Sequence, residues 1–222
     1  MRIDILTLFP EMFAPLETSL IKKAADKKLV KINILNIRDF SEDKHKKCDD
    51  YPFGGGAGLV MTPQPIASAM KSIRGYKSAL KIYMSPKGTP LKQSILKDLS
   101  REKHIIILCG HYEGIDQRII DKYIDAEISL GDFVLTGGEI PAMALVDGVS
   151  RYIDGVLGNA ESTEDESFSG CALEYPHYTR PQVFEGLEVP AVLVSGDHKK
   201  VDDWRKAESE KITHERRPDI LK

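Results

Sequence analysis

The feature that most constrains the fold of this sequence is a set of short segments that are apolar on both faces. Ile3–Leu8 and His104–Cys109 are the clearest examples, and each is short enough to be a single strand. Strands with two apolar faces are typical of parallel sheets that helices cover on both sides. Because segments with helical spacing separate them along the first two thirds of the chain, we predict an α/β fold with a parallel sheet.

The same reasoning places the other elements of this sheet. Two threonine–proline pairs, Thr62-Pro63 and Thr89-Pro90, indicate helix starts, since a hydroxyl residue then precedes a proline at the first helical position. We expect further strands at Val30–Ile34, Leu80–Ser85 and Ala126–Leu130, and helices over Glu11–Lys28, Arg118–Ile124 and Glu139–Tyr152.

Composition excludes several classes of protein. The chain has 222 residues, a net charge of −3 and 41% hydrophobic residues, which argues against a polybasic nucleic-acid binder and against wholesale disorder. Its three cysteines are far apart in the sequence, so we expect neither a zinc ribbon nor a disulfide framework. This use of cysteine is typical of proteins in the reducing cytosol. The longest apolar run, Ile105–Cys109, is too short to span a bilayer. We therefore expect a cytoplasmic protein with no membrane partner.

The composition changes near Asn159, where an acidic, polar run without periodicity begins. We predict three parts: a core domain at residues 1–158, a flexible linker at 159–174, and a small, mostly helical domain at 175–222. The last part carries several basic residues, of which Arg205, Arg216 and Arg217 are candidate phosphate contacts.

Three predicted strands end in loops rich in glycine or proline: Ser85–Gly88, Cys109–Gly114 and Leu130–Gly138. Ligands of open α/β sheets bind outside the carboxyl ends of the strands, and glycines let a flat ligand approach the main chain. Neither GxGxxG nor GxxxxGK[ST] is present, and Gly54–Gly58 lacks the Lys-Ser/Thr of a phosphate loop, so we interpret it as a flexible lid or a substrate loop. The loops therefore indicate a shared cleft for a nucleoside-like molecule.

Other residues near these loops suggest chemistry on a nucleic acid. Arg151 follows the helix that starts at Glu139, and Glu164–Glu166 lie in the acidic linker. The segment Pro176–Pro181 joins two rings and an arginine between prolines, a combination suited to stacking on an exposed base.

Taken together, these motifs resemble those of the bacterial tRNA (guanine-N1)-methyltransferases, the TrmD family, over essentially the whole chain. That family modifies the guanine at position 37 of tRNA, 3′ of the anticodon. The motifs that carry the resemblance are Phe9–Phe13, Gly54–Gly58, Cys109–Asp116, Gly131–Glu139 and Pro176–Pro181.

The resemblance implies a knotted methyltransferase fold of the SPOUT class with a deep trefoil knot, and a homodimer with shared active sites. It also implies that the anticodon stem-loop of tRNA is the partner and that S-adenosylmethionine is the methyl donor. The residues implied for the donor are Tyr83, Met84, Ser85, Pro86, Gly110, Tyr112, Glu113, Leu130, Gly131, Asp132, Phe133, Val134, Leu135, Thr136, Gly137, Gly138 and Pro141.

The resemblance further assigns roles at the target guanine. The family's base is an aspartate before a Ser-Phe pair, where this chain has Glu166; we favour Glu166 as the base, and Asp165 is the alternative. Arg151 would act on the guanine O6. The family suggests a magnesium requirement, although no ligand cluster in the sequence demands one. Residues expected to bind the substrate are Ser162, Phe168, His177, Tyr178, Arg180 and Arg217.

Two rival functions rank below this one. A ribose 2′-O-methyltransferase of the same knotted class would need no carboxylate acting on a base nitrogen. A non-catalytic RNA-binding or nucleotide-sensing module would use Gly54–Gly58 for phosphate and the C-terminal arginines for RNA.

Overall fold

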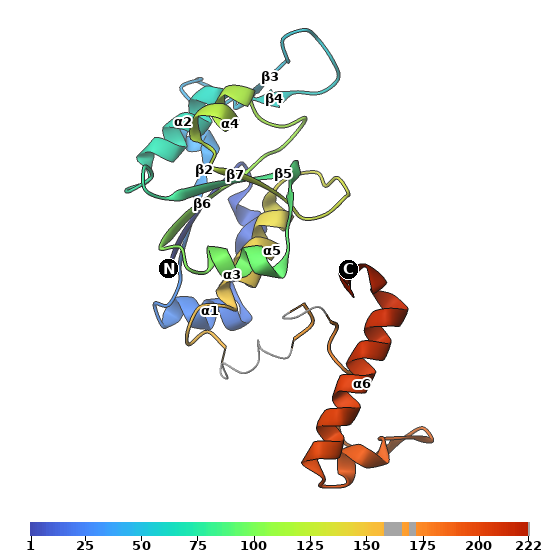
Figure 1. Cartoon of the computed structure of the whole chain (residues 1–222). Helices are drawn as coiled ribbons and strands as arrows, with labels where there is room; N and C mark the ends of the chain where they lie inside the picture. Colours follow the sequence, from blue (N-terminus) through green and yellow to red (C-terminus); the bar gives the residue numbers. More distant parts are fainter. Residues whose placement is uncertain (158–165, 169–171, 222) are drawn as a thin grey trace. The chain divides into compact units, whose positions relative to one another are not determined.

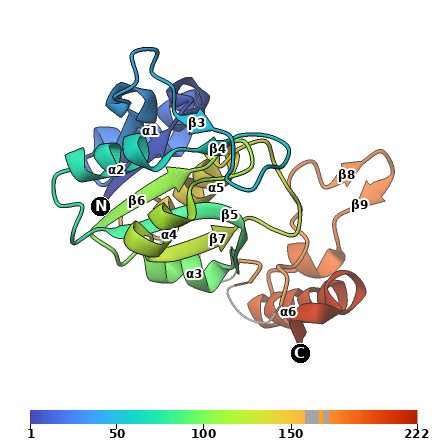
Figure 2. The same ribbon diagram turned by 90° about the horizontal axis from the view of Figure 1, so that it is seen from above.

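A computed structural model describes residues 1–157, 166–168 and 172–221, and the chain divides into two compact units, Met1–Gly158 and Asn159–Lys222 (Figure 1). The first unit contains a five-stranded sheet with the order β2-β1-β6-β5-β7, in which every neighbouring pair is parallel. Figure 2 shows β6, β5 and β7 side by side. The predicted α/β fold with a parallel sheet is thereby confirmed. The strands are β1 (Arg2–Thr7), β2 (Lys31–Asn36), β5 (Leu80–Pro90), β6 (His104–Cys109) and β7 (Ala126–Ser129).

Helices cover both faces of this sheet (Figure 1). One face is covered by η1 (Pro10–Glu17), α1 (Ser19–Asp26), α3 (Gln93–Leu99) and α5 (Glu139–Ser150). The other is covered by η2 (Ile37–Phe40), α2 (Pro63–Ser72) and α4 (Gln117–Tyr123).

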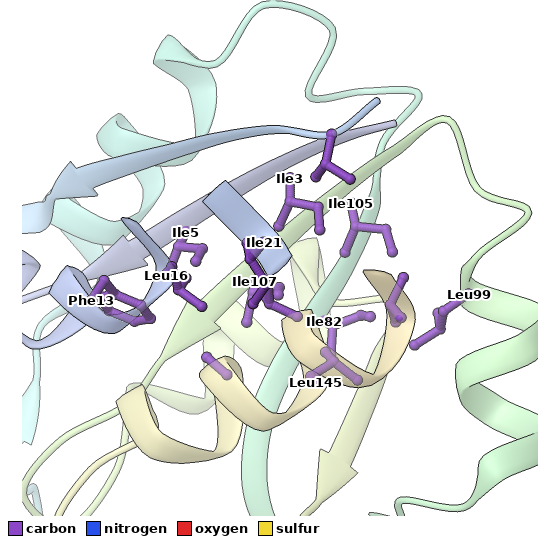
Figure 3. Close-up of a cluster of buried hydrophobic side chains, with 14 of the residues drawn as sticks. Ile3, Ile5, Phe13, Leu16, Ile21, Ile82, Leu99, Ile105, Ile107 and Leu145 are labelled. Carbon is purple, nitrogen blue, oxygen red and sulfur yellow. The ribbon is translucent and has the colours of Figure 1, made fainter. Parts of the chain in front are cut away.

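Alternate residues of the central strands enter two separate cores. On β6, Ile105 and Ile107 pack with one cluster, whereas Ile106 and Leu108 pack with the other. Figure 3 shows Ile105, Ile107 and Ile82 lying toward Leu145 of α5. Successive side chains of a strand point to opposite faces, so an unbroken apolar run is what a doubly covered strand requires.

Two local predictions were wrong. The helix expected over Glu11–Lys28 is interrupted: η1 contains Pro15, and Thr18 is extended before α1 begins at Ser19. Thr89-Pro90 does not start a helix but ends β5, because both residues pair with β7. Thr62-Pro63 does precede α2, although the threonine hydroxyl makes no capping hydrogen bond.

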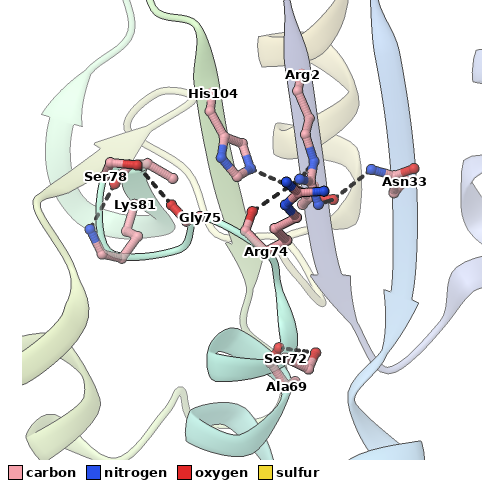
Figure 4. A network of polar contacts seen from close by, with 11 residues as sticks. Arg2, Asn33, Ala69, Ser72, Arg74, Gly75, Ser78, Lys81 and His104 are labelled. Atoms are coloured by element: carbon pink, nitrogen blue, oxygen red, sulfur yellow. Dashed lines mark hydrogen bonds and ion pairs between the residues drawn. The ribbon is translucent and has the colours of Figure 1, made fainter.

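A polar network stabilises the amino-terminal ends of the central strands, away from the loops that follow them (Figure 4). The carboxylate of Asp4, which is only 1% exposed, lies 2.8 Å from Arg2 Nε and 2.5 Å from His104 Nε2, and accepts a hydrogen bond from Asn33 Nδ2 at 2.6 Å. A buried carboxylate needs such partners, because its desolvation is otherwise uncompensated.

The second unit is built around one long helix, α6 (His198–Arg216). The hairpin β8 (Val183–Phe184) and β9 (Leu187–Glu188), with η4 (Ala191–Val194), precedes α6, and η5 (Pro218–Leu221) follows it. In the part of the chain that the structure describes, no helix combines the length and apolar character needed to cross a membrane.

Candidate active site

A pocket of about 260 Å³ lies at the carboxyl ends of β5, β6 and β7. This is the edge at which parallel α/β sheets bind their ligands, and the volume is near the lower end of small-molecule sites, about 300–1,000 Å³. Its wall is formed by Tyr83, Met84, Ser85, Pro86, Lys87, Gly110, His111, Tyr112, Glu113, Gly114, Ile115, Gln117, Ile120, Glu127, Ile128, Ser129, Leu130, Phe133, Val134, Leu135, Thr136, Gly137, Gly138 and Pro141.

The first loop of the pocket is an excursion within β5. Pairing with β7 stops after Met84 and resumes at Thr89, so the residues between them leave the sheet. Gly88 brings the chain back: a Cβ atom there would lie 2.4 Å from the carbonyl carbon of Glu127. Only glycine allows this approach of two backbones, and the approach fixes Ser85–Lys87 over the pocket.

The second and third loops are held together at the end of β6. The Gly138 N–H donates to the Gly110 carbonyl at 2.9 Å, and Gly137 forms an antiparallel bridge with His111. A Cβ atom on Gly138 would lie 2.8 Å from the Cα of Cys109. The loop after β7 therefore returns to β6, and its main chain closes the pocket before α5 begins.

Tyr83 supplies a neutral hydroxyl group to the pocket. Its side chain is buried on β5, and burial, with the nearby negative charge of Glu127, raises the pKa of Tyr83 to about 12. The phenol therefore stays protonated at neutral pH and can donate a hydrogen bond.

Two side chains of the pocket wall have a buried polar atom with no hydrogen-bond partner among the described residues: Nδ1 of His111 and Oε2 of Glu127. The His111 ring contacts the rings of Phe9 and Tyr112, each with its ring centroid 4.8 Å away. Buried polar atoms in a native fold are usually satisfied, so these two can serve a bound ligand. His111 lies within the loop Gly110–Glu113 expected to contact the donor, whereas Glu127 was not predicted; its sequence signal was the one charged residue in the strand Ala126–Ser129.

The structure brings most of the predicted donor-binding residues into this one pocket, but Gly131 and Asp132 do not line it. Arg151 does not line it either. It is the C-cap of α5, whose first residue, Glu139, follows the pocket loop. At a rise of about 1.5 Å per residue, the 12-residue helix places Arg151 about 18 Å from that end.

The predicted substrate-binding residues belong to the second unit. Ser162 and Asp165 lie outside the described residues, and Glu166 is described. The Arg217 guanidinium lies 5.4 Å from the Phe168 ring centroid and pairs with Asp219 at 2.7 Å.

The predicted base-stacking segment, Pro176–Pro181, contributes rings that contact other side chains of the second unit. His177 Nε2 lies 2.8 Å from Glu174, and the rings of Tyr178 and Trp204 are 6.2 Å apart. Arg180 is exposed. The unit thus presents guanidinium and aromatic groups together, as RNA-binding surfaces do.

No group of three or more histidine, cysteine, aspartate or glutamate side chains within the described residues is placed to hold a metal ion. The magnesium requirement suggested by the resemblance therefore gains no support from such a cluster among the described residues.

Comparisons with known proteins identify the family of the chain. The family model described as tRNA (Guanine-1)-methyltransferase TrmD matches residues 1–222. A protein of Alkaliphilus metalliredigens (strain QYMF) is 57% identical over 227 residues, with 100% of this chain and 92% of the relative covered. A Clostridioides difficile (strain 630) protein is 56% identical over 226 residues, covering 100% and 98%. Both are named tRNA (guanine-N(1)-)-methyltransferase. The chain therefore belongs to the tRNA (guanine-N1)-methyltransferase family and is a methyltransferase.

Proposed function

We propose that this protein transfers a methyl group from S-adenosylmethionine to N1 of the guanine at position 37 of tRNA, in the cytoplasm. The observation that carries the proposal is the pocket at the ends of β5, β6 and β7, in a chain whose family is named for methylation of guanine N1 in tRNA. Membership of a methyltransferase family does not support the alternative of a non-catalytic RNA-binding or nucleotide-sensing module. The alternative of a ribose 2′-O-methyltransferase disagrees with the names of the relatives, which specify guanine N1.

The pocket residues fit such a donor. Main-chain groups of the three loops can hold a flat adenine ring, and Tyr83, His111 and Glu127 offer polar atoms in a buried setting. The predicted donor-binding residues are proposed here as the holding groups, with Gly131 and Asp132 shaping the third loop from outside the wall. When bound, S-adenosylmethionine supplies a methyl group on a positively charged sulfur atom.

The protein's own groups would prepare the guanine. N1 carries a proton and is a poor nucleophile until that proton is removed. We therefore propose that the carboxylate of Glu166 accepts this proton, with Asp165 as the alternative. Negative charge then develops on O6, where the Arg151 guanidinium would donate a hydrogen bond, a contribution typically worth about 2.7–4 kcal/mol. No step is assigned to a metal ion.

Arg151 can act in this way only if a second copy of the chain completes the site. Within one chain it lies at the opposite end of α5 from the pocket. Apolar side chains are exposed at the pocket, namely Phe133, Val134 and Leu135 of its wall and the nearby Ile140, with Val134 80% exposed. Such a patch favours burial against a partner. We therefore propose a homodimer in which Arg151 and the acidic segment act at the partner's pocket.

The trefoil knot of the family is also proposed for this chain. Residues 130–138 leave β7 at the edge of the sheet and return beside the end of β6, although β5 lies between these two strands. A path of this kind supports threading of the chain past the β5 excursion.

The experiment uses unmodified tRNA, labelled donor and nucleoside digestion followed by mass spectrometry. The wild-type protein should form N1-methylguanosine, and replacing guanine 37 should abolish it. Glu166→Gln should lower turnover about 10²–10⁴-fold with donor affinity unchanged, whereas the control Glu161→Gln, in the same acidic run, should behave as wild type. An active Glu166→Gln with an inactive Asp165→Asn would move the base by one residue. A 2′-O-methyl product would refute the proposed function.

A further inference from the structure

Glu127 is the most unusual charged group of the pocket wall. It lies on β7 in register with Tyr83 of β5, so both side chains point to the same face of the sheet, and both line the pocket. The Oε2 atom of Glu127 is buried and has no hydrogen-bond partner among the described residues. A buried carboxylate oxygen without a partner is costly, which indicates that its partner arrives with a ligand.

The position of this carboxylate is set by rigid elements. The backbone of Glu127 is held between its pairing with Tyr83 and the close approach of Gly88, where a Cβ atom would lie 2.4 Å from the Glu127 carbonyl carbon. A group on a constrained strand keeps its geometry better than a group on a loop. Glu127 is thus suited to recognising one part of a ligand.

The charges around Glu127 favour a positively charged ligand. Of the described residues that line the pocket, Glu113 and Glu127 carry carboxylates, Lys87 carries an ammonium group, and His111 carries an imidazole. The negative charge of Glu127 also reaches the hydroxyl of Tyr83 and contributes to its raised pKa. With two carboxylates and one ammonium group, the wall should attract a cation, and the attraction is strongest at the buried Oε2 atom of Glu127.

We propose that Glu127 is a donor-specificity residue: its carboxylate stabilises the positive charge of the methyl donor, so that the pocket binds the sulfonium donor more tightly than the neutral thioether product. This inference rests on the proposed function, in which S-adenosylmethionine is the donor. When the methyl group moves to N1, the carbon–sulfur bonding pair stays on sulfur and the sulfonium charge is lost. Glu127 thereby favours binding of fresh donor over retention of the product S-adenosylhomocysteine.

Calorimetric binding of both ligands tests the proposal without an activity assay. We expect Glu127→Gln, which keeps the shape but removes the charge, to weaken S-adenosylmethionine binding about tenfold, or about 1.4 kcal/mol. Binding of S-adenosylhomocysteine should weaken less than about threefold, because its thioether sulfur is neutral and loses no charge interaction with the carboxylate. The control Glu102→Gln removes the same charge from an exposed position outside the pocket and should change neither affinity.

The outcomes separate the inference from its premise. Equal weakening of both ligands, or no weakening, overturns the role of Glu127, while failure of the wild-type protein to bind S-adenosylmethionine overturns the proposed function instead. Glu127→Asp keeps the charge and should retain most of the preference for the donor; a loss as large as that of Glu127→Gln would also overturn the inference. If circular dichroism shows that Glu127→Gln is unfolded, Glu127→Ser takes its place as the neutral variant.

Discussion

Closure of the pocket by Gly138 can be tested by comparison with a second glycine of the same helix region. Gly138 has φ −83° and ψ −2°, a conformation that alanine adopts without strain. A Cβ atom there would nevertheless lie 2.8 Å from Cys109 Cα and 3.0 Å from Gly110 N. Carbon atoms pack at about 3.5–4.0 Å, so two backbone segments would have to separate by about 0.7 Å or more.

Gly148, inside α5, provides the matched control. A Cβ atom there would lie 2.7 Å from Leu96 Cδ1, which is as close but is the end of a flexible side chain. A rotamer adjustment costs about 0.5–1.5 kcal/mol, and alanine gains about 1 kcal/mol over glycine within a helix. These two effects nearly cancel, whereas overpacking against backbone at Gly138 costs about 1–3 kcal/mol.

Urea unfolding and calorimetric binding of S-adenosylmethionine measure both consequences. Gly138→Ala should lower the free energy of unfolding by about 1–3 kcal/mol and weaken donor binding about tenfold or more, because the Gly138–Gly110 hydrogen bond would be lost with the closure. Gly148→Ala should stay within about 1 kcal/mol of wild type with donor affinity unchanged. A Gly138→Ala protein as stable and as tightly binding as wild type, or a more damaging Gly148→Ala, would refute the reasoning.

Two further predictions concern buried groups. Asp4→Asn should lower the free energy of unfolding, measured in urea, by about 3 kcal/mol, which is near the lower end for a broken buried ion pair because Arg2 is partly exposed. The control is Asp26→Asn, which removes an exposed ion pair and should cost less than about 1 kcal/mol. Equal effects of the two substitutions would contradict the prediction. Burial raises the pKa of the Cys109 thiol well above its ordinary value, so the thiol stays protonated at pH 8 and iodoacetamide should leave it unmodified in the folded protein. Peptide mapping by mass spectrometry that finds rapid alkylation of native Cys109 would contradict this.

Local patterns predicted the parts of the fold whose cause is local. The strand at His104–Cys109 was predicted with the bounds that the structure gives, because its unbroken apolar run matches the two cores on either side. Thr89-Pro90 was predicted wrongly because the reason for its extended conformation is the distant strand β7, with which both residues pair. The threonine–proline pair is a local signal for a helix start, but here the hydrogen-bonded pairing with a distant strand determined the conformation.

The candidate site divides in the same way. The sequence by itself determined that three glycine-rich loops follow buried strands, and parallel strands must bring such loops to one edge of a sheet. Only the tertiary structure brought the His111 ring against Phe9 and left the Glu127 Oε2 atom buried with no hydrogen-bond partner among the described residues. It also placed Arg151 at the far end of α5 from the pocket. Burial, hydrogen-bond satisfaction and separation in space depend on which distant segments become neighbours, and the pattern of residues along the chain does not contain that information.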